Sequence, residues 1–296
     1  MRYAVLMAIF RDRAVVLRTH KLGEADRIIT LLTQQHGLRR AVARGVRKTA
    51  SRFGGRLEPF SLVDVQCYEG RSLDNVSQVE TGKLYGVTLS QDYEAYMAAS
   101  AICETAVQLT ENEQHHSPAH FRLVAGALGA LAAQQAPPPL LLASYLLRAL
   151  AVAGWAAQFH TCVECGAEIL CTATPADAAD APTGADAGVA ASAGGAVFSF
   201  ELGGVLCTSC AQGELQPQQE SLATHTVPQP DTPPAATALG EAPFMSAAAL
   251  QLLQALQQGA WEQARAAAPA VQRSVSQTVE KYAQWHLERR LRSLLG

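Results

Sequence analysis

Two pairs of cysteines have the spacing that a metal site requires. Four of the seven cysteines stand in C-x-x-C pairs, Cys162 with Cys165 and Cys207 with Cys210. Two residues between cysteines let one tight turn present both thiolates to the same ion, and two such turns complete a tetrahedron. The pattern therefore predicts one structural Zn²⁺ per chain. A catalytic zinc is disfavoured because four thiolates leave no open coordination position.

The two pairs differ in their surroundings. Gly166 follows the first pair and suits the turn, since a glycine at positive φ lets N–H groups approach sulfur, whereas Ala211 follows the second. The pairs are 41 residues apart, wider than the usual spacing of about 15–20, and the tract 172–196 accounts for the excess as an insertion. Cys171 could compete as a ligand. Reduced cysteines without a metal are the alternative.

A cluster of cations near the N-terminus is the second group that could do chemistry. Seven Lys and Arg residues stand between positions 39 and 56, with no carboxylate among them. They are Arg39, Arg40, Arg44, Arg47, Lys48, Arg52 and Arg56. Clustered cations release counterions from phosphates, so this basic segment is predicted to bind nucleic acid.

An aromatic residue and two glycines lie inside the basic segment. Gly54 and Gly55 permit close approach of a ligand to the backbone, and Phe53 could stack on a base as in single-strand binders. A lone phenylalanine is more often a packing residue, however. A solvated basic face or a patch for anionic membranes is the alternative interpretation of the cations.

The charge distribution agrees with a polyanionic partner for the N-terminal part. Residues 1–83 hold fifteen Lys and Arg against eight Asp and Glu, whereas the rest of the chain holds eight against eighteen. HExxH, GxSxG, Walker A and GxGxxG motifs are all missing from the sequence, which argues against an enzyme. The apolar run 4–10 is too short to span a bilayer, and paired cysteines fit a reducing compartment, so a cytoplasmic protein is expected.

Five short apolar runs separated by turn residues are expected to form strands that position the cations. They are Ala14–Thr19, Arg27–Thr33, Leu38–Val46, Phe60–Tyr68 and Leu73–Glu80. In the fourth run Val63, Val65 and Cys67 alternate with polar residues, which is typical of a half-buried strand. Five strands within about seventy residues have the size of a small closed barrel of the OB type.

The remainder of the chain is expected to be mainly helical. Apolar residues recur at helical spacing from Tyr93 to Leu109, from Phe121 to Leu131, over Leu140–Gln158, and from Val271 to Leu294. The fold class is therefore α+β and multidomain. We expect an OB-fold DNA-binding domain at 1–83, a helical domain at 84–160 and 244–296, a zinc-binding module at 161–211 and a proline-rich linker at 212–243.

The order of several segments resembles the RecO family of bacterial recombination mediators. The segments are AVVLRTHKLGEADRIITLLTQQHGLRRAVARG (14–45), RKTASRFGGRLEPFSLVDVQCYEGRSLDNVSQVE (47–80) and EKYAQWHLERRLRSLL (280–295). The C-x-x-C pairs are similar to those of zinc-bearing members. The likeness covers most of the chain apart from the tracts 172–196 and 212–243, while the leader Met1–Arg13 is slightly longer than expected.

The resemblance implies a DNA-repair function in the RecF pathway without enzymatic turnover. It implies binding of single- and double-stranded DNA, annealing of complementary strands, and joint action with RecR to load RecA onto DNA coated by single-strand-binding protein. Two rival hypotheses are a zinc-ribbon adaptor whose basic loop binds RNA or an acidic partner, and a metallohydrolase, which would need a histidine or carboxylate ligand.

Overall fold

The structure is a computed structural model, which describes residues 8–111, 118–169, 195–215 and 243–287. Its internal contacts divide the chain into two compact units. The first unit holds the described residues up to Gly154, and the second holds Trp155–Trp285. Cys171, Leu291, Leu294 and most of the tracts 172–196 and 212–243 lie outside the described residues.

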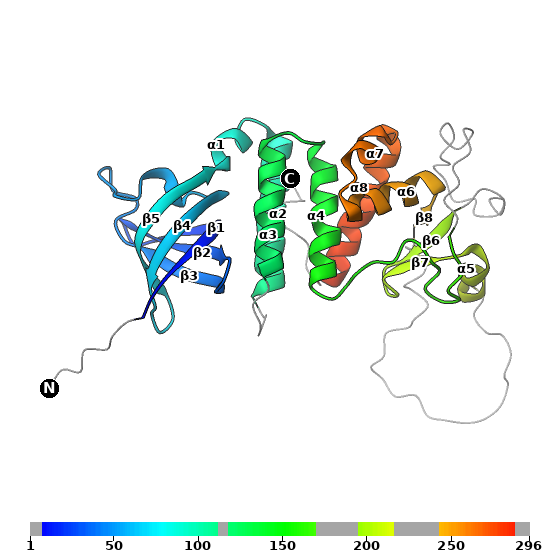
Figure 1. The fold of residues 1–296 in the computed structure, drawn as a ribbon, viewed down its shortest axis with the longest axis horizontal. Coiled ribbons are helices and arrows are strands. Elements are labelled where there is room, and N and C mark those ends of the chain that lie inside the picture. The colour runs from blue at the N-terminus through cyan, green and yellow to red at the C-terminus, as the bar shows by residue number, and fades with distance from the viewer. Residues whose placement is uncertain (1–7, 112–117, 170–194, 216–242, 288–296) are drawn as a thin grey trace, which may run out of the picture. The chain divides into compact units, whose positions relative to one another are not determined.

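The first unit begins with a closed five-stranded barrel (Figure 1). Its strands are β1 (Ile9–Leu22), β2 (Asp26–Thr33), β3 (Gly37–Ala43), β4 (Ser61–Tyr68) and β5 (Asp74–Leu84), with the short 3₁₀ helix η1 (Gly54–Leu57) between β3 and β4. Around the barrel their order is β1-β2-β3-β5-β4, and β4 pairs with β1 to complete the circle. The prediction of an N-terminal OB-type barrel is confirmed.

The first strand is longer than its apolar core predicted. The sequence indicated Ala14–Thr19, but β1 starts at Ile9, and Ile9–Val15 pairs with β4 while Ala14–Leu22 pairs with β2. A register shift between Val16 and Arg18 lets one strand serve both neighbours. Residues 9–13, which the sequence analysis assigned to the leader, are therefore part of the barrel wall. Buried and exposed residues alternate at the start of β1, where Phe10 and Asp12 are buried between exposed neighbours. The sequence did not reveal this alternation because Asp12, a charged residue, occupies one of the buried positions.

The barrel encloses an apolar core, as the alternation in β4 predicted. Val63, Val65 and Cys67 are buried in it together with Ile29 and Leu31 of β2. Burial raises the pKa of the Cys67 thiol to about 12, so this thiol stays protonated. The residues on the opposite face of β1, β2 and β4 are buried as well, although they do not belong to that core; examples are Val15, Leu32 and Leu62.

Helices cover that outer face of the barrel. They are α1 (Tyr85–Leu89), α2 (Tyr93–Thr110), α3 (Pro118–Ala132) and α4 (Pro138–Val152), and both α2 and α3 contact β1. The Asp92 side chain caps α2 by accepting from two backbone N–H groups. The predicted helix Leu140–Gln158 is wrong at its end, because α4 stops at Val152 and Gly154 adopts φ +99°.

In its described residues, the second unit combines a small sheet with four helices. The strands are β6 (Ala196–Ser199), β7 (Gly204–Leu206) and β8 (Phe244–Met245), and the helices are α5 (Thr208–Leu215), α6 (Ala247–Gln258), α7 (Trp261–Ala266) and α8 (Pro269–His286). The strand order is β7-β6-β8. Phe198 of β6 packs against Phe159 and Tyr282 at centroid distances of 5.2 and 5.0 Å, which fixes α8 to the sheet.

Candidate nucleic-acid interface and metal centre

The two ends of the barrel carry different loops, as the strand registers require. Leu22 of β1 pairs with Asp26, so the turn at 23–25 shares one end with the connection at 44–60 between β3 and β4. Ile9 pairs with Tyr68, so the turns at 34–36 and 69–73 lie at the other end. We call the first the basic end, the second the paired end, and residues 44–60 the basic connection.

Hydrogen bonds tie the basic connection to the turn beside it. The Gly45 N–H donates to Asp26 Oδ1 at 2.7 Å, and the Arg47 N–H donates to the Ala25 carbonyl at 2.9 Å. The Arg47 guanidinium also donates to the Gly23 carbonyl at 3.1 Å. Gly45 has φ +68°, a left-handed conformation that side-chain-bearing residues rarely adopt. The start of the connection is therefore held in one conformation, which positions its cations.

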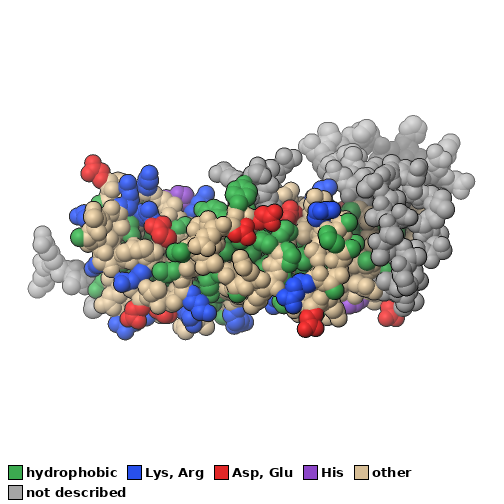
Figure 2. All heavy atoms as spheres, turned by 90° about the horizontal axis from the view of Figure 1, so that it is seen from above, with side chains coloured by type: hydrophobic (Ala, Val, Ile, Leu, Met, Phe, Trp, Pro, Cys, Tyr) green, Lys and Arg blue, Asp and Glu red, His purple; other side chains and the backbone are tan. Residues whose placement is uncertain are grey.

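Most of the predicted cations lie on the surface at this end. Arg44, Arg47, Lys48 and Arg52 are exposed, and Arg56 is half-buried. Arg40 is exposed on β3, and the next residue, Ala41, is buried in the barrel core. Figure 2 looks onto this end of the barrel and shows Lys and Arg side chains gathered over it. The structure therefore places five of the seven cations on the connection at the basic end and leaves Arg40 exposed on the neighbouring strand β3.

Arg39 has a different environment from the other six cations. Its guanidinium makes a bidentate ion pair with the buried Asp74 at 2.8 and 3.0 Å, and Glu69 lies 3.7 Å away. It also lies over the Phe10 ring, 5.1 Å from the centroid. Within the described residues, the ion pairs of the basic segment all involve Arg39. Its charge is already compensated by carboxylates at the paired end.

Phe53 belongs to the barrel core rather than to the surface. Its side chain is 1% exposed and packs with the interior residues of the barrel. The Arg52 guanidinium covers the ring from outside, 4.7 Å from the centroid. The prediction that Phe53 could stack on a base is wrong, and its interpretation as a packing residue is confirmed.

Sequence reasoning missed cations of the basic end that lie outside the run at 39–56, and Lys21 is one of them. Lys21 is exposed on β1, and its register partner is Arg27, next to the turn that holds the basic connection. Arg27 itself is bound to Glu58 at 2.6 Å, whereas the Lys21 ammonium is exposed. The signal was available in the sequence, since Lys21 stands two residues before Gly23, but it lay outside the run at 39–56.

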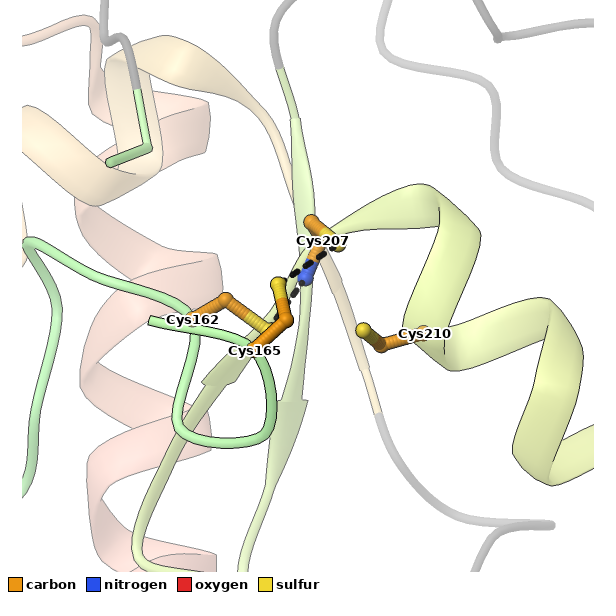
Figure 3. A group of neighbouring side chains, drawn as sticks. All are labelled: Cys162, Cys165, Cys207 and Cys210. Atoms are coloured by element: carbon orange, nitrogen blue, oxygen red, sulfur yellow. Dashed lines mark hydrogen bonds between the residues drawn. The ribbon is translucent and has the colours of Figure 1, made fainter. Parts of the chain in front are cut away.

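The four predicted cysteine ligands converge in the second unit. The Sγ atoms of Cys162, Cys165, Cys207 and Cys210 all lie within 4.8 Å of one another, and Figure 3 shows the four side chains turned toward a common centre. Cys162 and Cys165 come from a turn after α4, Cys207 follows β7, and Cys210 lies on the first turn of α5. Cys171 lies outside the described residues.

The two pairs reach this geometry through different backbones. Gly166 adopts φ +73°, and its N–H donates to the Cys162 carbonyl at 2.9 Å, which closes the first turn as predicted. The second pair instead occupies a helix start, where the Ala211 N–H donates to the Cys207 carbonyl at 2.9 Å. Three residues along a helix return to the same face, so this pair needs no glycine, and Ala211 is buried against the cluster.

Hydrogen bonds prepare the cluster for a cation. Burial raises the pKa of the Cys162 thiol, but hydrogen bonds from the backbone N–H groups of Cys165, Cys207 and Glu164 outweigh it and lower the pKa to about 6. Hydrogen bonds to the Cys207 and then the Cys165 sulfur raise the pKa of Cys210. The hydrogen bonds from backbone N–H groups thus favour the thiolate form of Cys162, which is the form that binds a metal.

The sulfur positions fit a tetrahedral zinc ion. Four sulfurs at about 2.3 Å from Zn²⁺ would lie about 3.8 Å apart. The distance from the Cys165 sulfur to the Cys207 sulfur is 3.8 Å. Cys165 is exposed, and Cys207 and Cys210 are half-buried, so an ion can reach the site from solvent. The donor set and its spacing are therefore compatible with a structural metal site.

Comparison with known families covers nearly the whole chain. The family model described as Recombination protein O N terminal matches residues 7–85, and the one described as Recombination protein O C terminal matches residues 90–229. The chain belongs to the RecO family. It is thus a recombination mediator of DNA repair. The N-terminal RecO match contains the barrel and the whole basic segment, and the C-terminal RecO match contains all four cysteines of the cluster.

None of the helices in the described parts of this RecO-family chain is both long and apolar enough to cross a membrane. Among these described helices, α2 and α8 are the longest, with 18 residues each, and both carry polar residues along their length. The resemblance that the sequence suggested is confirmed by the two family matches.

Proposed function

We propose that the chain binds single- and double-stranded DNA through the basic end of its barrel. The observation that carries this proposal is a segment of cations without any carboxylate, in which Arg56 is half-buried and the others are exposed, namely Arg40, Arg44, Arg47, Lys48 and Arg52. Cations without acidic partners gain most from phosphate, because no internal ion pair has to be broken. Arg39 contributes mainly through its contact with Asp74.

We further propose that this surface anneals complementary strands and acts with RecR to load RecA onto DNA coated by single-strand-binding protein. The support for these partners is membership of the RecO family. The physical support for annealing is that a cationic surface can neutralise two backbones together, which lowers the repulsion between the strands. We expect this work to take place in the cytoplasm and to involve no enzymatic turnover.

A salt titration of the full chain tests the DNA-binding proposal. Not all six cations point the same way, so we expect about three to five phosphate contacts and a log–log slope of roughly −2 to −3.5 on single strands. Affinity should be similar for unrelated sequences, because phosphate contacts position a protein without specifying a base. A clear preference for RNA, or a flat salt dependence, would contradict the proposal and favour an adaptor that binds RNA or an acidic partner.

Annealing should be measured with and without single-strand-binding protein. We expect the chain to accelerate pairing of complementary oligonucleotides in both conditions. If it binds DNA but leaves the annealing rate unchanged, the binding proposal stands and the annealing proposal fails.

We propose that Cys162, Cys165, Cys207 and Cys210 hold one structural Zn²⁺. Metal analysis of the purified chain should find about one zinc per chain. Cys165→Ser should lose the metal and lower the thermal midpoint, because a zinc site contributes directly to folding. Cys171→Ser serves as the control and should do neither. Loss of zinc in Cys171→Ser with retention in Cys165→Ser would contradict this assignment.

A further inference from the structure

Two tyrosines on the first turn of α2 have exposed side chains. Tyr93 is 68% exposed and Tyr96 is 42% exposed, whereas the large apolar residues further along α2, such as Ile102, are buried. The two tyrosines are three residues apart, so they lie on the same side of the helix. The Asp92 cap fixes this turn, since its side chain accepts from the N–H groups of Glu94 and Ala95. The rings are therefore presented by a rigid element.

The basic connection ends against Tyr96, the more buried of the two tyrosines. The Phe60 and Tyr96 rings meet edge to face, with centroids 5.4 Å apart and planes at 90°. The Phe60 N–H donates to the Val16 carbonyl at 2.9 Å, which anchors the end of the connection to β1. Gly86 of α1 lies close to Pro59 of the basic connection, since a Cβ atom at position 86 would be only 3.1 Å from the Pro59 carbonyl oxygen. The basic connection, α1 and the start of α2 thus form one continuous region of the first unit.

The side chains of this region change from cationic to apolar. In Figure 2, Lys and Arg side chains over the barrel are followed over the neighbouring helices by hydrophobic side chains, with some Asp and Glu side chains among them. Val87 of α1 is 68% exposed and Leu84 is 40% exposed, beside the two tyrosines. A surface of this kind matches the two parts of a single strand, which offers phosphates on one side and unpaired bases on the other.

We infer that Tyr93 and Tyr96 form a base-stacking platform for single-stranded DNA whose phosphates lie on the basic connection. The inference rests on the proposed function and adds to it a site for the bases. A tyrosine ring can stack on any base, so the platform adds affinity without sequence preference. In duplex DNA the bases are already stacked and paired, and the platform gives a duplex no equivalent contact.

The carboxylates nearby do not block the platform. Asp92 uses Oδ1 for the two N–H groups of its own helix. Glu94 follows Tyr93 by one residue, which is a rotation of about 100° around the helix and places it nearly opposite Tyr96. Phosphates approaching from the basic connection on the Tyr96 side therefore avoid Glu94.

Substitutions of Tyr93 test the platform, because its high exposure separates binding from folding. Affinity should be measured by fluorescence anisotropy for an oligo-dT strand and for a duplex of equal length. Tyr93→Ala should weaken single-strand binding by about tenfold, a typical stacking contribution, and duplex binding by less than about twofold. Tyr93→Phe should retain wild-type affinity, because the ring remains. The salt slope should stay unchanged in both variants, since no phosphate contact is lost.

A tyrosine at the other end of the barrel provides the matched control. Tyr68 is 38% exposed at the end of β4, away from the basic connection. Tyr68→Ala should leave single-strand affinity unchanged. Thermal midpoints of all variants should be recorded, and a Tyr93→Ala/Tyr96→Ala double variant should show a larger loss on single strands than Tyr93→Ala does.

The outcomes separate this inference from the proposed function. If the wild-type chain binds no DNA, the proposed function and the platform both fail. If the wild-type chain binds DNA with the expected salt slope but Tyr93→Ala retains single-strand affinity, the platform alone is wrong, and its apolar area is left for a protein partner. Equal losses on single strands and duplex would also overturn the platform, because stacking discriminates between them.

Discussion

The two ends of the barrel hold similar cations in different environments. At the paired end, Arg39 is bound to Asp74 and lies near Glu69, and His36 contacts Asp12 at 2.8 Å. At the basic end, Arg44, Arg47 and Lys48 are exposed in a segment without carboxylates. The difference arises from chain topology, since Asp74 is 35 residues from Arg39 in the sequence. A basic run in a sequence thus contains both structural and ligand-binding cations, and strand register separates them.

The largest effect should come from removing the acid at the paired end. Asp74 accepts two hydrogen bonds from Arg39 and one from the Gly70 N–H. Asp74→Ala should lower the free energy of unfolding by about 3 kcal/mol, because it leaves Arg39 and a backbone donor without their partner. Urea unfolding measures the change. DNA affinity, measured under native conditions, should stay within about twofold of wild type.

Asp64→Ala is the control for that change. Asp64 is an exposed carboxylate on β4, so its removal should change the free energy of unfolding by less than about 0.5 kcal/mol. Similar losses in the two variants would mean that the paired end is no more dependent on its acids than the rest of the barrel surface.

The next effect should appear in binding and leave stability intact. The double variant Arg44→Ala/Arg47→Ala should weaken single-strand binding by roughly tenfold and make the log–log salt slope shallower by roughly 1.4, because two phosphate contacts are lost. The matched control is Arg71→Ala, an exposed arginine in the turn at the paired end, which should bind like wild type.

A double variant with unchanged affinity and slope would move the DNA site away from the basic end. Arg289, Arg290 and Arg292 would then be the next candidates, although they lie outside the described residues. An equal loss in Arg71→Ala would show that the two ends do not differ in DNA binding.

The smallest effect should come from Asp26, one of the acids at the basic end. Asp26 accepts from the Gly45 N–H and from no arginine. Asp26→Ala should therefore lower the free energy of unfolding by only about 1 kcal/mol, the typical value of one hydrogen bond. Asp26→Asn keeps an acceptor oxygen at the same position and should be closer to wild type. A loss as large as that of Asp74→Ala would remove the energetic distinction between the two ends.

Local patterns in the sequence predicted much of the fold. The alternation of Val63, Val65 and Cys67 placed β4 correctly, because a half-buried strand imposes period two on neighbouring residues. Gly166 indicated the first cysteine turn, because a backbone position that needs a positive φ favours glycine, and Gly166 has such a φ. The convergence of the four cysteines was predicted for the same reason, because each C-x-x-C pair is a local unit.

Features that depend on distant partners were not predictable in this way. The ion pair of Arg39 needs the register that brings Asp74 beside β3, and no local pattern contains it. Tyr93 was expected to mark the apolar side of a helix, but it is 68% exposed. The helix boundary at Val152 was missed because Ala-rich sequence continues past it until Gly154.

The short seam between β3 and β5 has a consequence for how the barrel opens. These strands are the only parallel neighbours in the barrel, and they share just two residue pairs, Ala41 with Asp74 and Val42 with Asn75. Their ladder can separate while the longer antiparallel ladders stay intact, so local opening there costs less than global unfolding. The Arg39–Asp74 ion pair connects β3 to β5 and holds the two strands together. Amide hydrogen exchange should therefore show that β3 and β5 separate before the rest of the barrel exchanges.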